Sequence, residues 1–275
     1  MRPADRPLLV ASLGLLALWA GGTDAIYRFL RPSMRPWLLL AGVVLLVLAA
    51  VTGWATWRDH REPSGAGEDG PDADLDHTPA AADRPGGGEG HDPHAHRPSK
   101  IGWLLLAPVV VAVALDPLPL GAASASRAGS VNRASVGPFD LATYLRTNSL
   151  AGQAPPLSQG HFMAAADDPA QRDLLAATPV RLTGFVASTS GPGRFQLSRL
   201  VIGCCAGDAV PILVDVHADG LAVPPVDTWV EVEGRFDPAA TDQATAEQQR
   251  AVPPVVDATA VRTIDPPVEP YEYPT

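Results

Sequence analysis

The residues best suited to chemistry are the adjacent pair Cys204 and Cys205, followed three positions later by Asp208. They are the only cysteines of the chain, which excludes a disulfide framework. Two thiols and a carboxylate can ligate a zinc-like divalent cation, with His217 as a further candidate ligand. Adjacent thiols can instead close a strained, easily reduced disulfide or fill a buried turn as small residues. The residues leave these three interpretations open.

A second group of potential metal ligands lies in residues 58–99, which hold five of the seven histidines. His91, His94 and His96 form a loose tract with Asp92, of the kind that collects metal ions. The same segment has ten acidic residues, four arginines and almost no large apolar side chains, which predicts a disordered acidic linker. The alternative interpretation is a solvated linker that binds nothing.

Other chemistry has little support in the sequence. We find no hydrolase elbow, phosphate-binding loop, HExxH motif or paired catalytic carboxylates, and we therefore expect no enzymatic activity. The formal net charge is −10, and residues 179–275 alone carry 13 acidic residues against six arginines. Nucleic acid is therefore not expected as a partner, because its phosphates would be repelled.

The elements that must position Cys204 and Cys205 are β-strands. From residue 180 onward apolar and polar residues alternate with a period of two, most clearly where Val230 and Val232 alternate with Glu231 and Glu233. Gly184 and Gly234 lie inside predicted strands and mark a bulge or a sharp bend. Five short strands with interior glycines predict an OB-like barrel, with a β-sandwich fragment as the alternative. The predicted strands are 180–188, 194–202, 210–216, 228–236 and 255–263.

One or two short helices are expected before the barrel. Pro138 precedes the helical pattern FDLATYLR, in which Phe139, Leu141 and Leu145 are available for packing. Asp168 and Pro169 then supply an N-cap and a first helical residue, and Thr178-Pro179 ends that second helix.

The first half of the chain is predicted to cross a lipid bilayer. Between Arg35 and Arg58 lie 22 uncharged residues, enough for one transmembrane helix, with tryptophans at both ends. Residues 7–23 are a shorter uncharged stretch, which we interpret as a retained helix rather than a signal peptide. Residues 101–115 form a third apolar segment. Seven basic residues on the side of the N-terminus and linker, against five on the other, favour a cytoplasmic linker and an extracytoplasmic C-terminal domain.

The predicted fold is therefore a membrane α-helical N-terminal part followed by a soluble, mainly-β C-terminal domain. The chain is expected to be a multi-pass protein of the cell membrane. Its predicted segments are a two-helix transmembrane hairpin (1–57), the linker (58–99), a third transmembrane segment (100–123), a tether (124–137) and the soluble OB-like domain (138–275).

With these features in order, the chain resembles the YcgQ-like family of permease accessory subunits. Besides the hairpin, linker and third span, the resemblance is carried by five C-terminal motifs: Gly184-Phe185-Val186, Phe195–Arg199, Cys204–Ala209, Asp227–Gly234 and Pro267–Tyr273. The chain departs from the family in a linker poorer in histidine, which weakens a metal-collecting role, and in Gly207, where relatives often have alanine.

The resemblance implies a small accessory subunit that works with a larger multi-span permease. The leading hypothesis is therefore a non-enzymatic accessory subunit of a membrane permease, with a metal cation as the candidate cargo. Two other hypotheses remain. The chain could be a membrane-tethered thiol or metal-relay module that acts through Cys204 and Cys205, or an envelope OB module that binds a glycan or a peptide.

Overall fold

A computed structural model describes residues 5–59, 120–127, 139–148, 152–248 and 252–274. The chain divides into two compact units. The first consists of residues 1–19 and 39–116, and the second of residues 20–38 and 117–275. The second unit therefore joins the loop between the first two helices to the C-terminal domain. The linker histidines His91, His94 and His96 and residues 100–119 of the predicted third span lie outside the described residues.

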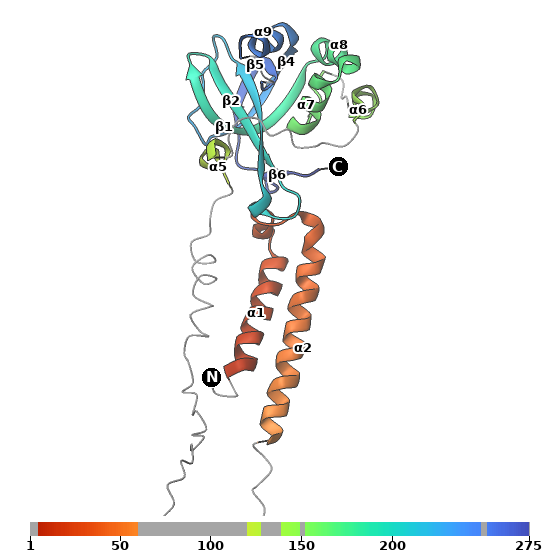
Figure 1. The fold of residues 1–275 in the computed structure, drawn as a ribbon, viewed down its shortest axis with the longest axis vertical. Coiled ribbons are helices and arrows are strands. Elements are labelled where there is room, and N and C mark those ends of the chain that lie inside the picture. Colours follow the sequence, from red (N-terminus) through yellow and green to blue (C-terminus); the bar gives the residue numbers. More distant parts are fainter. Residues whose placement is uncertain (1–4, 60–119, 128–138, 149–151, 249–251, 275) are drawn as a thin grey trace, which may run out of the picture. The chain divides into compact units, whose positions relative to one another are not determined.

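Two apolar helices account for the described part of the first unit: α1 (Asp5–Gly22) and α2 (Arg35–Asp59) (Figure 1). They cross closely at Gly14 and Gly42. A Cβ atom built on Gly14 would lie 3.0 Å from the carbonyl oxygen of Gly42, and one on Gly42 would lie 2.9 Å from the Leu18 side chain. Small residues at such crossings let helix backbones approach, as is common between membrane helices.

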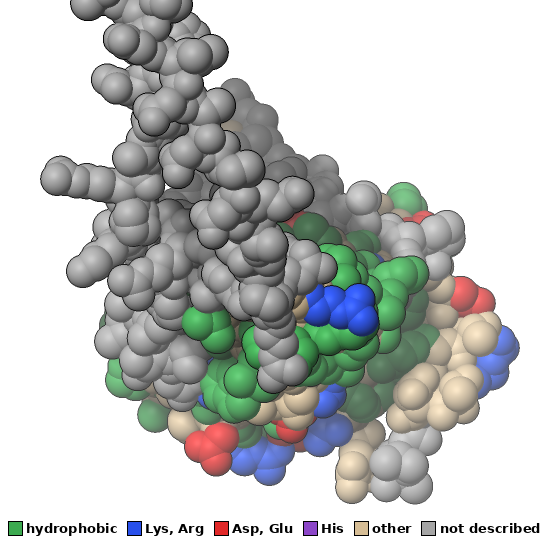
Figure 2. Space-filling view, turned by 90° about the horizontal axis from the view of Figure 1, so that it is seen from below, with side chains coloured by type: hydrophobic (Ala, Val, Ile, Leu, Met, Phe, Trp, Pro, Cys, Tyr) green, Lys and Arg blue, Asp and Glu red, His purple; other side chains and the backbone are tan. Residues whose placement is uncertain are grey.

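Only α2 is long and apolar enough, among the described helices, to cross a membrane, over Pro32–Ala55. Its apolar side chains Leu40, Val43, Val47 and Val51 are exposed. The apolar part of α1, Pro7–Gly22, is shorter. Figure 2, which views the molecule from below, shows hydrophobic side chains gathered in one broad area with few charged ones among them. The length and apolar composition of α2 thus suit a membrane span, and a signal sequence has the same two properties.

The C-terminal domain is built on a closed barrel of five strands (Figure 1). Around the barrel the order is β1-β2-β3-β5-β4, and β4 pairs again with β1. All neighbours are antiparallel except β3 and β5, which are parallel. The five predicted strands are confirmed, and closure of the sheet excludes the sandwich. The strands are β1 (Val180–Gly191), β2 (Arg194–Val201), β3 (Val210–His217), β4 (Trp229–Asp237) and β5 (Val255–Thr263).

The alternation read from the sequence decides which side chains fill the barrel. Val230 and Val232 are fully buried, whereas Glu231 and Glu233, which alternate with them, are only half-buried and face outward. The same rule buries Val214 and Val216 on β3 and leaves Asp215 and His217 on the outer face. Burial of this inner apolar face is the main favourable contribution to folding of the domain.

Helices cover the barrel and its ends. The predicted helices before the barrel are present as α6 (Leu141–Asn148) and α8 (Pro169–Ala177), and Asp168 caps α8 by accepting from the backbone N–H of Ala170. Within the predicted soluble domain, residues 138–275, two further helices were not predicted: α7 (Gln159–Asp167), capped by Ser158, and α9 (Pro238–Gln248), between β4 and β5. Leu141, Phe162 and Leu175, one from each of α6, α7 and α8, are buried in the main core with the barrel valines.

The two strand glycines have different roles. Gly234 lies at a register shift between β4 and β5, which confirms the predicted bulge. Gly184 has no such shift in its pairing with β4. A Cβ atom there would lie 2.4 Å from Nε2 of Gln159 and 2.5 Å from the carbonyl oxygen of Ser198. Glycine at this position therefore makes room for the buried Gln159 side chain, whose Nε2 donates to the carbonyl of Thr183.

The C-terminal segment contacts the barrel through a short strand and contacts α7 through the buried carboxylate of Glu272. A short strand, β6 (Tyr271–Glu272), pairs in parallel with β2. The Glu272 carboxylate accepts from the backbone N–H groups of Gln159 (2.7 Å) and Gly160 (2.9 Å) at the start of α7. A helix N-terminus favours a negative charge, although burial raises the pKa of Glu272 above its usual value. The Pro267–Tyr273 motif is thus a structural closure of the domain.

The domain also extends further toward the N-terminus than the predicted boundary at residue 138. Helix α5 (Ala122–Arg127) occupies the end of the predicted third span and the start of the predicted tether. Ala122 and Ala125 are buried against Phe185, Trp229 and Tyr271. The backbone N–H of Ala122 also donates to the Asp227 carboxylate. Ala122 and Ala125 are therefore packing residues of the domain.

Candidate functional site

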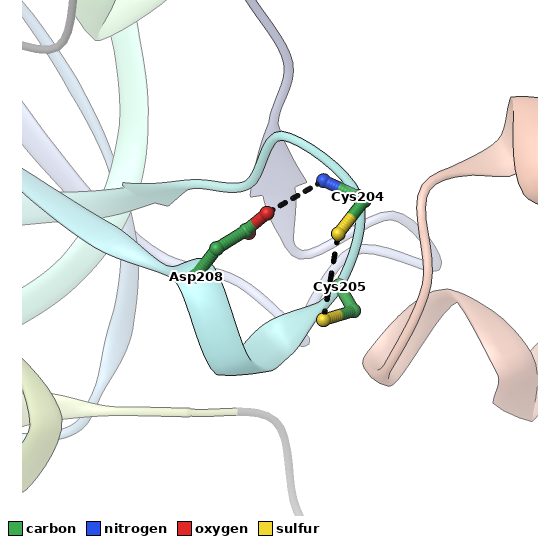
Figure 3. Close-up of side chains that lie close together, drawn as sticks. All are labelled: Cys204, Cys205 and Asp208. Carbon is green, nitrogen blue, oxygen red and sulfur yellow. Dashed lines mark hydrogen bonds between the residues drawn. The ribbon is translucent and has the colours of Figure 1, made fainter.

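The cysteine pair lies in the connection between β2 and β3 (Figure 3). A single 3₁₀ turn, η3 (Ala206–Asp208), shapes this connection. The Asp208 carboxylate accepts from the backbone N–H groups of Gly203 (3.0 Å) and Cys204 (2.8 Å). Aspartate commonly organises turns in this way, because its short side chain reaches the backbone nearby. These hydrogen bonds fix the shape of the loop. They also keep the Asp208 carboxylate beside the two thiols.

The turn brings together the three predicted ligands of the loop. The Sγ atoms of Cys204 and Cys205 are 3.7 Å apart. This is well beyond a disulfide bond of about 2.05 Å, and both residues are free thiols. One ligand atom from each of Cys204, Cys205 and Asp208 lies within 4.8 Å of the other two. Cys204 is exposed and Cys205 half-buried, so the interpretation as small residues in a buried turn does not describe Cys204.

The electrostatics of the loop keep the Cys204 thiol protonated. Its hydrogen bond to Asp208 and then its contact with Cys205 raise the pKa of Cys204 to about 11. Desolvation is the largest single effect on Asp208 and acts to raise its pKa, but the hydrogen bonds from Cys204, Gly203 and Cys205 together lower that pKa below its usual value. A thiolate is the form that attacks disulfides and ligates metals. The raised pKa therefore disfavours spontaneous redox chemistry, whereas a bound cation would displace the proton and supply the compensating charge.

Sequence reasoning missed the partner of this loop, which is the segment between α1 and α2. That segment contains the 3₁₀ helices η1 (Asp24–Arg28) and η2 (Pro32–Met34). Residues Leu30 and Cys205 form an antiparallel bridge. On its two sides, the N–H of Arg31 donates to the Cys204 carbonyl (3.2 Å) and the N–H of Ala206 donates to the Phe29 carbonyl (2.7 Å). The backbone of the cysteine pair is thus paired with the α1–α2 loop.

Side chains of the C-terminal motif extend the same contact. The Tyr271 hydroxyl donates to the Arg28 carbonyl at 2.9 Å. The Arg31 guanidinium donates to the Pro274 carbonyl (3.2 Å) and lies 5.7 Å from the centre of the Tyr273 ring, within range of a cation–π interaction. The main-chain contacts could not be read from residue types, because backbone pairing needs no particular side chain at these positions.

The predicted histidine ligands do not join the cysteine loop. His91, His94 and His96 are outside the described residues. The prediction that His217 could complete the cysteine site is wrong, because Val210 and His217 are the opposite ends of β3. A strand of eight residues is roughly 25 Å long, and the loop precedes its first residue. His217 lies instead with Asp237 and Asp257. His161 stacks on the ring of Phe139 at a centroid distance of 4.1 Å and has a packing role.

Comparison with known families finds one match: residues 171–274 match the model of the DUF1980 C-terminal domain. The matched range contains the five barrel strands, the Cys-Cys loop and β6. No protein among the curated sequences matches the chain.

Proposed function

We propose that this chain is a non-enzymatic accessory subunit of a membrane permease complex and that the Cys-Cys loop handles a divalent metal cation for it. The observation that carries the proposal is the pairing of that loop with the α1–α2 loop through Arg31 and Phe29. The match to the DUF1980 C-terminal domain is in keeping with the resemblance to YcgQ-like subunits, though it concerns residues 171–274 alone.

The pairing matters because it connects a ligand set to the apolar helices by backbone contacts. A cation held by both thiols and Asp208 would fit Sγ atoms 3.7 Å apart, because two tetrahedral Zn–S bonds of about 2.3 Å place their sulfurs at roughly that separation. The carbonyl of Cys204 and the N–H of Ala206, which flank those thiols, are bonded to the α1–α2 loop. A cation bound there would therefore fix residues that are hydrogen-bonded to the connection between α1 and α2, where a multi-span partner could respond to its presence.

The membrane part of the proposal rests on α2 and on the composition of the chain. The exposed leucines and valines of α2 form an apolar surface that suits lipid or a membrane-embedded partner. The barrel has the strand order of an OB fold, with β1-β2-β3 consecutive and β3 parallel to β5. Its acidic surface favours cations over nucleic acid as ligands.

Whole-cell metal content tests the cation function. The host strain is deleted for this chain and complemented with wild type, with Cys204→Ser/Cys205→Ser, with Asp208→Asn, or with Asp219→Asn as an exposed control. We expect the deletion to change the cellular content of one divalent cation. Wild type and Asp219→Asn should restore it, whereas the two loop variants should not, at equal amounts in the membrane fraction. Full restoration by the double serine variant would refute the role of the thiols.

Purification from detergent extracts of the native host tests the accessory role separately. The chain is expected to co-purify with one multi-span protein in a fixed ratio. A homogeneous preparation of the chain alone, together with unchanged metal content in the deletion strain, would refute the proposed function.

A further inference from the structure

A second group of ligand-type side chains lies at the end of the barrel where β3 ends. His217 is the last residue of β3, Asp237 is the last residue of β4, and Asp257 is the third residue of β5. In the parallel β3–β5 pair, His217 lies directly opposite Asp257. In the antiparallel β4–β5 pair, Asp237 lies opposite Val255, two residues from Asp257 and on the same face. The register of three strands therefore brings these side chains together.

The resulting geometry is compact. One ligand atom from each of the three side chains lies within 4.8 Å of the other two, and Nδ1 of His217 is 3.5 Å from Oδ1 of Asp257. Asp237 is held in place because its Oδ1 accepts from the backbone N–H of Ala240 at 3.0 Å, at the start of α9. The positions are thus set by the barrel and by a helix cap rather than by a flexible loop.

The surroundings are negatively charged and open to solvent. A cavity of about 490 Å³ beside the cluster is lined by His217 and by the carboxylates of Asp215 and Glu247. Arg194 also lines it, but its guanidinium pairs with Asp219 at 3.3 Å. Arg235, which lies opposite Asp257 on β4, donates to the carbonyl of Ala177. Among the described residues, Arg194 and Arg235 are therefore engaged with other groups, and the side chain that pairs with Asp257 is His217.

We propose that His217, Asp237 and Asp257 form a binding site for a divalent cation, separate from the cysteine loop. An imidazole and two carboxylates suit a borderline cation such as Zn²⁺, Co²⁺ or Mn²⁺, with water in the remaining positions. The exposed side chain of Asp257 leaves the site open for exchange. This site does not depend on the proposed function, because it lies at the other end of β3 from Cys204 and Cys205 and uses none of their atoms.

The test is a Co²⁺ titration of the purified full chain in detergent, followed by visible absorption. The starting variant carries Cys204→Ser, Cys205→Ser, His91→Ala, His94→Ala and His96→Ala, so that the loop and the linker tract contribute nothing. We expect it to bind one Co²⁺ with d–d bands and without the near-ultraviolet charge-transfer band of a Co–thiolate bond. Adding His217→Ala or Asp257→Asn should raise the dissociation constant by about tenfold or more.

Asp173→Asn, an exposed aspartate of α8, is the matched control and should change the dissociation constant less than twofold. Thermal unfolding without metal shows whether each variant is folded, and His217→Gln replaces His217→Ala if the alanine variant is not. Equal Co²⁺ binding with and without His217 and Asp257, or no Co²⁺ binding by the starting variant, would overturn the site. The cluster would then be only an ion pair beside a helix cap.

Discussion

At Cys204, a neighbouring carboxylate opposes ionisation of a thiol that is otherwise exposed. The hydrogen bond to Asp208 is the largest cause of the raised pKa, and Cys205 is the second. Asp208 in turn accepts the N–H groups of Gly203 and Cys204, so the residue that shapes the loop also controls its chemistry. The thiol is consequently a weak nucleophile near neutral pH.

This arrangement predicts slow alkylation of Cys204. With a pKa of about 11, only roughly a thousandth of the thiol is ionised at pH 8, and the rate should rise with pH up to that value. In a Cys205→Ser background, Asp208→Asn keeps an acceptor for the loop N–H groups but removes the negative charge. Iodoacetamide labelling of Cys204 at pH 8 should then be about tenfold faster. An unchanged rate, equal to that of the control Asp219→Asn, would contradict the role of Asp208.

At the scale of single elements, Gly184 of β1 allows α7 and β2 to pack closely against this strand. Gly184 leaves space for Gln159 at the start of α7 and for the carbonyl of Ser198 on β2. The neighbours that a Cβ atom would meet include backbone, which cannot move away as a flexible side chain would. Packing between α7 and the barrel therefore explains the glycine of the Gly184-Phe185-Val186 motif.

Gly184→Ala should lower the free energy of unfolding by about 1–3 kcal/mol, because the added methyl group overfills a closed space. Gly207→Ala is the matched control. A Cβ atom on Gly207 would meet only Sγ of Cys205, at an ordinary 3.6 Å. Its effect should stay within about 0.5 kcal/mol. Thermal unfolding of the full chain, followed by near-ultraviolet circular dichroism, measures both. Equal melting temperatures for the two variants would contradict this account of Gly184.

At the scale of the whole molecule, the contacts of the α1–α2 loop constrain membrane topology. A loop whose backbone is hydrogen-bonded to the Cys-Cys loop must lie on the same side of a bilayer as the barrel. If α2 crosses the membrane, the chain must cross back before α5. The predicted third span, residues 100–123, is where the sequence places that return.

Single cysteines in the Cys204→Ser/Cys205→Ser background test this topology. Ser33→Cys lies in the α1–α2 loop, and Ser190→Cys lies near the end of β1; both positions are exposed. A membrane-impermeant maleimide should label both in intact cells, whereas Ser99→Cys in the linker should react only after lysis. Labelling of Ser33→Cys and Ser190→Cys from opposite sides would contradict the loop contact. Protection of both, with labelling of Ser99→Cys in intact cells, would reverse the orientation.

The sequence alone determined the features that depend on short stretches of chain. Alternation located the five strands, and the Asp168-Pro169 signal located the start of α8. The same signal stands at Asp237-Pro238, yet α9 was missed because its alanine, threonine and glutamine residues show no apolar face. The adjacency of Cys204, Cys205 and Asp208 was likewise readable, since a three-residue turn brings near sequence neighbours together.

Only the tertiary structure decided which distant residues meet. His217, Asp237 and Asp257 converge because closure of the barrel sets the register of β5 against both β3 and β4. Phe29 and Arg31 reach the Cys-Cys loop through backbone atoms, which every residue except proline offers alike, so no residue type announces the contact. Strand register and backbone pairing arise from packing of the whole domain, and a pattern of residue types does not encode them locally.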